Sequence, residues 1–291
     1  MKIICLLSEG ILFCMEESKM MITASGGSHR GEHRENNEDN YQIGTYFKEF
    51  LIDQDTYSCV PTEISSNRYY IVSVFDGMGG GENGELASMY AAEEIRSAYM
   101  KIQGKSVTPE IVKTMICDAF QSANNRIMRD SFEILGTTGV VGIFDLYKKT
   151  LKILWSGDSR AYLYRDGYLF QLTQDQSIGA ISLENGFYTQ ANPQYQIDKN
   201  KLTGYIGNDG YGYTFSPLES NWIPLNDKDA ILLATDGLYG SFTEEELNEL
   251  IRGSSINDAV LCQRNILNAA VSRNIGDDMT LVYASVTGKK V

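Results

Sequence analysis

The stretch YYIVSVFDGMGGGENGELAS, residues 69–88, joins a run of β-forming residues to a helical pattern through a glycine-rich bend. The run 69–76 is rich in aromatic and β-branched residues, which is typical of a buried strand. Asp76 ends this strand and Gly77 follows it. Turns favour aspartate and glycine in any protein. The rest of the sequence therefore has to decide whether Asp76 has a chemical role.

The other elements follow from the spacing of apolar residues. Apolar side chains recur every three or four residues over 86–102 and 110–128, which predicts two helices covering one face of a sheet. Further strands are predicted at 39–47, 137–147, 150–157, 160–167, 168–173, 229–236 and 278–286. Further helices are predicted at 243–251, where Thr243 and Glu246 form a capping box, and at 256–271. Residues 53–67 are predicted to be a hairpin excursion, and 176–201 a polar, irregular surface excursion.

Successive strands followed by paired helices favour α+β layers over alternating βαβ units. No repeat or linker divides the chain, so we predict a single domain at 23–291. Residues 1–22 are interpreted as a leader that is not part of the native domain. Glu9 interrupts their apolar stretch, and no small-residue cleavage site follows it.

Charge and cysteine content restrict the function. The 291-residue chain has 25 basic and 38 acidic side chains, a net charge of −13. This acidity argues against a nucleic-acid partner, whose backbone requires cationic contacts. The five cysteines include no CxxC pair and are interpreted as reduced thiols. With no segment apolar enough to span a membrane, these features predict a cytoplasmic protein.

Carboxylates recur at the ends of predicted strands. They occur in the pairs Asp76-Gly77, Asp236-Gly237, Asp277-Asp278 and Glu38-Asp39, and in the turn containing Asp158. Each acid alone is ordinary in a turn, but gathered acids would repel one another and raise their pKa values. Hard divalent cations such as Mg²⁺ or Mn²⁺ relieve that repulsion through oxygen ligands. The pattern therefore indicates a divalent metal site.

With these acids the sequence resembles the metal-dependent Ser/Thr protein phosphatases of type 2C, the PPM family, in their bacterial form. The similarity covers roughly residues 25–287. Its motifs, in order, are RENNED (34–39), DGMGGGENGELAS (76–88), GTTGVV (136–141), SGDSRAYLYRDGYLFQLTQDQS (156–177), LTGYIG (202–207), LLATDGLYGSFTEEEL (232–247) and GDDMTLV (276–282). One motif would be weak evidence, but seven in family order are strong evidence.

The resemblance implies a four-layer α-β-β-α sandwich of two mostly antiparallel sheets flanked by helix pairs. It also implies two core Mn²⁺ or Mg²⁺ ions and a more weakly held third. Asp76 would bridge the core ions, Glu38 and the Gly77 carbonyl would hold one, and Asp236 and Asp277 the other. Asp158 with Asp236 would serve the third ion, Arg34 would grip the substrate phosphate, and Asp39 would orient water.

Hydrolysis of phosphoserine or phosphothreonine would then proceed by direct attack of a metal-activated water, without a phosphoenzyme. The substrate would be a phosphoprotein, with an opposing Ser/Thr kinase, and the enzyme a monomer. The chain departs from the family at Gly81 and Gln176, where histidine is frequent. It departs again at Asp278, where asparagine is usual.

Two alternatives are weighed against this reading. A pseudophosphatase, acting only as a binding module, typically lacks one or more metal acids, whereas here each expected position carries its acid. The related phosphatases of anti-sigma-factor antagonists usually lack the R-x-x-N-E-D start, which this chain has.

Overall fold

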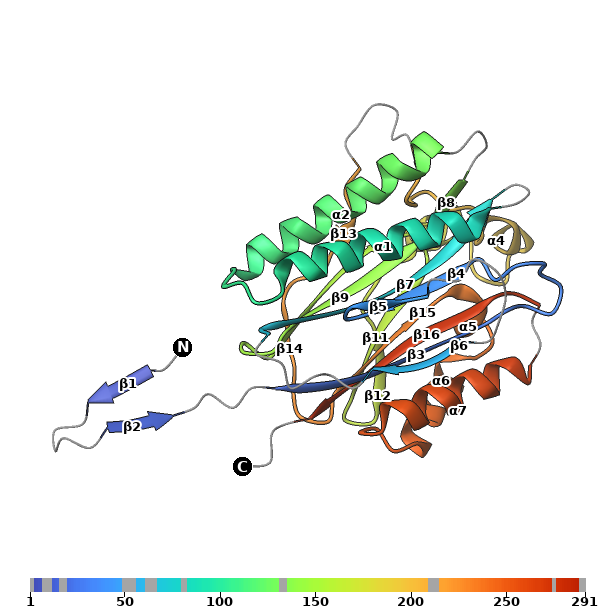
Figure 1. Ribbon diagram of the computed structural model, residues 1–291. Coiled ribbons are helices and arrows are strands. Elements are labelled where there is room, and N and C mark those ends of the chain that lie inside the picture. Colours follow the sequence, from blue (N-terminus) through green and yellow to red (C-terminus); the bar gives the residue numbers. More distant parts are fainter. Residues whose placement is uncertain are drawn as a thin grey trace.

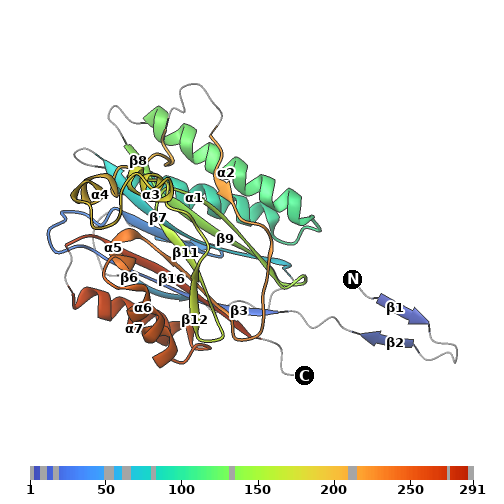
Figure 2. The same ribbon diagram turned by 180° about the vertical axis from the view of Figure 1, so that it is seen from behind.

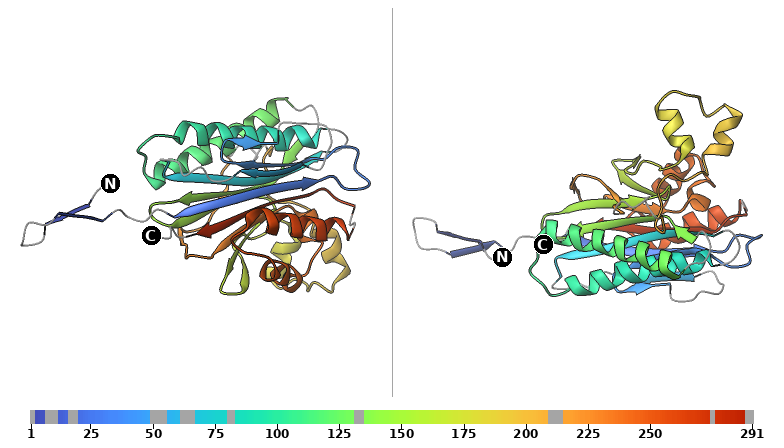
Figure 3. Two further views of the ribbon diagram at one scale, coloured as in Figure 1. Left: turned by 60° about the horizontal axis from the view of Figure 1, so that its bottom comes forward. Right: turned by 90° about the horizontal axis from the view of Figure 1, so that it is seen from above.

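The computed structural model describes residues 3–6, 12–15, 20–48, 56–60, 67–79, 83–130, 135–208, 215–273 and 276–287. Two antiparallel sheets pack face to face, and a pair of helices covers the outer face of each (Figures 1 and 3). This is the predicted four-layer sandwich. None of the helices in the described ranges combines the length and apolarity needed to cross a membrane.

The first sheet has eight strands within the described residues. Their order is β13 (Leu218–Glu219), β10 (Thr150–Ser156), β9 (Gly139–Asp145), β7 (Tyr69–Gly79), β4 (Asp39–Ile43) and β5 (Tyr46–Phe47), with β14 (Ile223–Pro224) paired to β10 and β8 (Leu135–Thr137) paired to β7. The run 69–76 is thus the centre of this sheet. The predicted strand 39–47 is a tight hairpin, since Gly44 adopts a φ of 59° that reverses the chain.

The second sheet has six strands within the same ranges. Their order is β12 (Tyr168–Gln171), β11 (Arg160–Arg165), β15 (Ala230–Ala234), β16 (Met279–Thr287), β3 (Met21–His29) and β6 (Thr56–Val60). A separate two-stranded pair, β1 (Ile3–Leu6) and β2 (Leu12–Met15), precedes them. The predicted hairpin excursion at 53–67 is wrong where it is described, because 56–60 forms an edge strand of this sheet.

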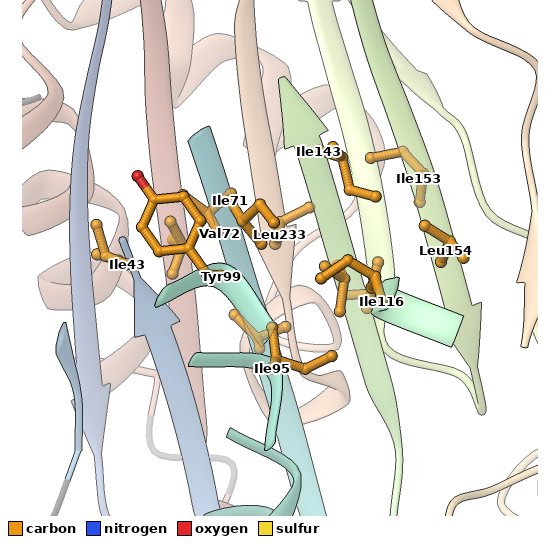
Figure 4. Close-up of a cluster of buried hydrophobic side chains, with 14 of the residues drawn as sticks. Ile43, Ile71, Val72, Ile95, Tyr99, Ile116, Ile143, Ile153, Leu154 and Leu233 are labelled. Atoms are coloured by element: carbon orange, nitrogen blue, oxygen red, sulfur yellow. The ribbon is translucent and has the colours of Figure 1, made fainter. Parts of the chain in front are cut away.

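Both helix pairs lie where the apolar spacing predicts them. The helices α1 (Gly84–Ile102) and α2 (Pro109–Asp130) cover the first sheet, and Ile95, Tyr99 and Ile116 point into its core (Figure 4). The helices α6 (Glu244–Gly253) and α7 (Ala259–Val271) cover the second sheet. The predicted capping box at the start of α6 is confirmed, since the side chains of Thr243 and Glu246 bond each other's main-chain N–H.

The domain begins earlier than predicted. Met20 and Ile22 are buried, and Ile22 pairs with Val286 in the second sheet, so the predicted boundary between residues 22 and 23 cuts through β3. Its sequence, MITASGGSH, contains little apolar alternation and was not predicted as a strand. Pairing with β16 and β6 on its two sides supplies the order that local pattern does not indicate.

The excursion at 176–201 is regular rather than irregular. It contains α3 (Ile178–Glu184), whose N-cap is Ser177, and α4 (Pro193–Asp198), whose N-cap is Asn192 with proline at the first helical position. Both helices project from the body of the sandwich (the yellow segment in Figures 2 and 3). Their polar sequences hide this structure because a two-turn helix presents too little apolar periodicity.

Antiparallel pairing brings the acid-bearing strand ends together. Asp39, the first residue of β4, lies directly opposite Asp76 of β7. Likewise, Ala234 at the end of β15 lies opposite Leu281 near the start of β16. Antiparallel strands place the end of one beside the start of the next. Acids separated by up to 240 residues therefore meet at one end of the sandwich.

Candidate active site

A cavity of about 230 Å³ opens at that end of the sandwich. Its described lining consists of Arg34, Glu38, Asp76, Gly77, Met78, Gly79, Thr138, Asp158, Asn200, Leu202, Asp236 and Asp277. Seven of the eight predicted site residues are in this set; Asp39 is not. Five lining residues carry carboxyl groups and one, Arg34, carries a guanidinium group. The site is thus strongly acidic.

Asp76 is held by its main chain at the end of β7. Its N–H donates to the Thr138 hydroxyl at 3.1 Å, and its carbonyl accepts from the Thr138 N–H at 2.8 Å. Burial raises the pKa of Asp76 well above the ordinary range, and the charges of Asp39 and Asp236 raise it further. Such a carboxyl group is destabilised as an anion until a cation approaches it.

Gly77 is required by close packing. A Cβ atom there would lie 2.2 Å from the Gly84 carbonyl oxygen and 2.5 Å from that of Glu38. A Cβ at Gly84 would in turn lie 2.6 Å from the carboxylate of Glu38. The two glycines therefore let β7 and the start of α1 close around Glu38.

Glu38 and Arg34 share one wall of the cavity. Arg34 Nη1 lies 3.7 Å from Glu38 Oε2, and Arg34 Nη2 forms a short ion pair with Asp277 Oδ1. The Arg34 side chain is still 44 % exposed, so it can reach a ligand in the cavity. Burial raises the pKa of Glu38, and Arg34 opposes that rise.

Asp236 and Asp158 lie on the strand ends of the second sheet and its connection to the first. Asp236 begins the short helix α5 (Asp236–Tyr239). Burial and Asp277 raise its pKa. Asp158 lies in the turn between β10 and β11 and is 8 % exposed. Burial, with the charge of Asp236, raises the pKa of Asp158 to about 8.

Asp39 lies behind the cavity wall and not on it. It is 1 % exposed, and its Oδ2 accepts from the Thr235 hydroxyl at 2.8 Å. Its Oδ1 is buried without a hydrogen-bond partner within the described ranges. Thr235 directly precedes Asp236. Asp39 therefore contacts the chain neighbour of an acid that lines the cavity.

Asp277 and Asp278 face different ways. Asp277 lines the cavity, whereas both oxygens of Asp278 accept main-chain hydrogen bonds, from Gly31 and from Glu38, each at 2.8 Å. This difference is not the alternation of a strand, because β16 begins only at Met279. Asp278 is instead oriented by the loop that carries Glu38.

Five lining residues were not predicted as site residues: Met78, Gly79, Thr138, Asn200 and Leu202. Thr138, in the GTT motif, bonds the main chain of Asp76 and the Ser159 hydroxyl at 2.7 Å. Its motif was the signal that could have identified it. Asn200 and Leu202 follow α4 and line the cavity. No local signal marks them.

The departures from the family have structural roles of their own where they are described. Gln176 joins the excursion to the turn before Asp158, since its Oε1 accepts from the Gly157 N–H at 2.8 Å. Gly81 lies outside the described residues. Met78 lines the cavity.

The site suits hard divalent cations. The acids offer oxygen ligands, burial and mutual repulsion raise several of their pKa values, and close packing at Gly77 is built around Glu38. Within the described ranges, no three acidic, histidine or cysteine side chains already surround one point as a finished metal cage. The acids line the cavity instead, with Arg34 paired to Asp277.

Known proteins share both sequence and fold. The family model described as protein phosphatase 2C matches residues 48–260. The serine/threonine phosphatase stp of Listeria monocytogenes is 29 % identical over 187 residues, covering 62 % of this chain and 71 % of the relative. The serine/threonine phosphatase of S. agalactiae superposes with a TM-score of 0.72 at 19 % identity, over 91 % of this chain and 99 % of that one.

A third comparison adds a metal-bound structure. The catalytic domain of the phosphatase PstP, in complex with two manganese ions, superposes with a TM-score of 0.66 at 21 % identity, over 92 % of this chain and 99 % of that one. The sandwich and its acidic cavity thus define a phosphatase of the metal-dependent class. The chain belongs to the protein phosphatase 2C family and is a protein-serine/threonine phosphatase.

Proposed function

We propose that the acid-lined cavity is the catalytic centre and that it holds two Mn²⁺ or Mg²⁺ ions. Asp76, which lines the cavity, would hold both ions. Glu38 and the Gly77 carbonyl would hold one ion, and Asp236 and Asp277 the other. Asp158, beside Asp236, would serve a third, weaker ion. The gathering of five carboxylates around one cavity carries this proposal.

The bound ions would supply a nucleophilic water at neutral pH and charge compensation for the phosphoryl oxygens. The chain's own residues bind and orient the substrate. Arg34 reaches from the rim to the phosphate, since a guanidinium fork matches two phosphate oxygens. To reach the phosphate, Arg34 gives up part of its ion pair with Asp277 and contacts the phosphate oxygens instead. Asp39 holds Thr235 and offers its second oxygen to an ordered water.

The cavity also argues against an inactive binding module. Every acid expected at the metal positions is present and lines the cavity. A pseudophosphatase would keep the sandwich without needing to bury carboxylates that repel one another. The reaction proposed for such a site is direct attack by a metal-activated water, without a phosphoenzyme.

Chelation tests the proposal directly. Exhaustive removal of divalent ions with EDTA is expected to abolish hydrolysis of para-nitrophenyl phosphate and of a phosphothreonine peptide, and added Mn²⁺ to restore both. Circular dichroism after chelation serves as the control for folding, because the sandwich core does not include the cavity. Undiminished hydrolysis in EDTA would show that the acids have another role.

The third-ion role of Asp158 has its own test. Asp158→Asn is expected to leave two ions bound in calorimetry and to lower turnover of a phosphopeptide by about tenfold or more, as loss of a supporting ligand does. Asp166→Asn is the matched control, since Asp166 occupies the next hairpin turn, is exposed and does not line the cavity. If the Asp158 variant equals wild type at every metal concentration, Asp158 only shapes its turn.

The cellular role is proposed from the reaction. A Ser/Thr phosphatase reverses what a kinase adds, so we place this enzyme opposite a Ser/Thr kinase, as a monomeric cytoplasmic domain. Comparison of phosphoproteomes with and without the gene tests the kinase relation, and sedimentation of the purified protein tests the monomer.

A further inference from the structure

Lys48 is a buried lysine behind the catalytic cavity. It follows β5, is 5 % exposed and does not line the cavity. Its Nζ donates to the carbonyl oxygen of Asp39 at 2.6 Å and points to that of Asn37 at 3.4 Å. These two carbonyl groups flank Glu38. No sequence pattern singles Lys48 out.

Burial of a lysine is costly and requires partners. Here the nearest acids are Asp39 and Asp278, which are 1 % and 4 % exposed. Their charges attract the ammonium group, but within the described residues its hydrogen bonds go to main-chain carbonyls and not to a carboxylate. Lys48 therefore holds the main chain at residues 37 and 39 in place and also adds a positive charge near the acids.

The main chain of Glu38 is held on its remaining sides. Its N–H donates to Asp278 Oδ2 at 2.8 Å. Its carbonyl oxygen accepts from the Ser88 hydroxyl at 2.6 Å and from the Gly77 N–H at 3.2 Å. With Lys48 on the two flanking carbonyls, only the Glu38 side chain is left to face the cavity.

We propose that Lys48 and Ser88 are positioning residues for Glu38, which fix the main chain at 37–39 so that its carboxylate stands ready at the cavity wall. The inference rests on the proposed role of Glu38 as a metal ligand. Lys48 crosses from the β4–β5 hairpin, and Ser88 comes from α1. The two elements thus hold the same short segment from different sides.

Removal of Lys48 has two effects of opposite sign on metal binding. Loss of a cation near an acidic site makes the potential more negative and would strengthen binding of Mn²⁺. Loss of the two contacts to main-chain carbonyls releases Glu38 and would weaken it. The direction of the change in affinity therefore distinguishes a charge role from a positioning role.

Lys48→Met is the main variant, because methionine keeps the aliphatic length and removes the donors. Lys152→Met is its matched control. Lys152 is 7 % exposed and donates to a main-chain carbonyl, that of Ser220, at 2.6 Å, but it lies on β10 away from the cavity lining. Both variants are expected to lower the melting temperature.

Lys48→Met alone is expected to weaken Mn²⁺ binding by about tenfold or more in calorimetry, as loss of an outer partner of a ligand does. In EDTA, hydrogen exchange of the peptide 31–41 is expected to be faster in Lys48→Met than in Lys152→Met. Ser88→Ala, a smaller change, is expected to weaken Mn²⁺ binding in the same direction, and it keeps the inference testable if Lys48→Met does not fold.

Unchanged or tighter Mn²⁺ binding in folded Lys48→Met, or unchanged binding in Ser88→Ala, would overturn the inference. Glu38→Gln separates this outcome from a failure of the proposed site. If Glu38→Gln binds Mn²⁺ as wild type does, the ligand assignment itself is wrong. If Glu38→Gln loses affinity and the two positioning variants do not, only the inference about Lys48 and Ser88 fails.

Discussion

Replacement of Asp76 by asparagine is expected to remove turnover while the protein stays folded. Asparagine has nearly the same volume, and the main-chain hydrogen bonds that hold this position to Thr138 do not involve its side chain. The variant loses the charge that would bind both ions. Loss of one preorganised electrostatic group lowers kcat by about 10²–10³-fold. We expect at least this fall in kcat for Asp76→Asn, with no recovery at high Mn²⁺.

The same substitution is expected to stabilise the metal-free protein. Asp39, Asp236 and Asp158 all repel a charge at this position, and asparagine carries none. In EDTA the variant should therefore melt at a higher temperature than wild type, whereas Mn²⁺ should raise the melting temperature of wild type only. An Asp76→Asn protein that is active, or that melts lower than wild type in EDTA, would contradict the central place given to Asp76.

Loss of Asp277 is expected to be nearly as severe. Asp277 lines the cavity and pairs with Arg34. Under the proposed assignment, Asp277→Ala would remove a ligand of one ion and the partner of the guanidinium group proposed to bind phosphate. Turnover is expected to fall by orders of magnitude, and Mn²⁺ titration should show one fewer tightly bound ion. Measurement of kcat against Mn²⁺ concentration separates lost binding from lost chemistry.

Asp278→Asn is the natural comparison at the neighbouring position. Both Asp278 oxygens accept main-chain hydrogen bonds. Asparagine has only one acceptor oxygen, and its amino group would face an N–H donor. The variant is expected to stay active but to need more Mn²⁺, by about tenfold, because Glu38 is held less firmly. An inactive Asp278→Asn beside an active Asp277→Ala would reverse the two roles.

Local pattern was sufficient for much of the architecture. The apolar spacing in α1 and α2, the capping box of α6 and the β-rich run ending at Asp76 are properties of a few neighbouring residues. The same holds for an acid placed at a strand end. The order of these acids along the chain, with the family motifs around them, predicted which residues would share one site.

The elements that local pattern did not predict depend on contacts outside their own sequence. The strand β3 is poor in apolar alternation and is ordered by pairing with β16, more than 250 residues later. The helices α3 and α4 are too short for periodicity to indicate them. In both cases the stabilising partners are absent from the local sequence.

The sequence by itself thus determined the layers, the family and the set of acids. Only the tertiary structure decided which acid faces the cavity and which supports it from behind. Asp277 and Asp278 are adjacent and chemically identical, yet one lines the cavity and the other holds the main chain of Glu38. The physical reason is that a side chain's direction and burial depend on contacts with segments far away in the chain, such as those of Asp278 with Gly31 and Glu38.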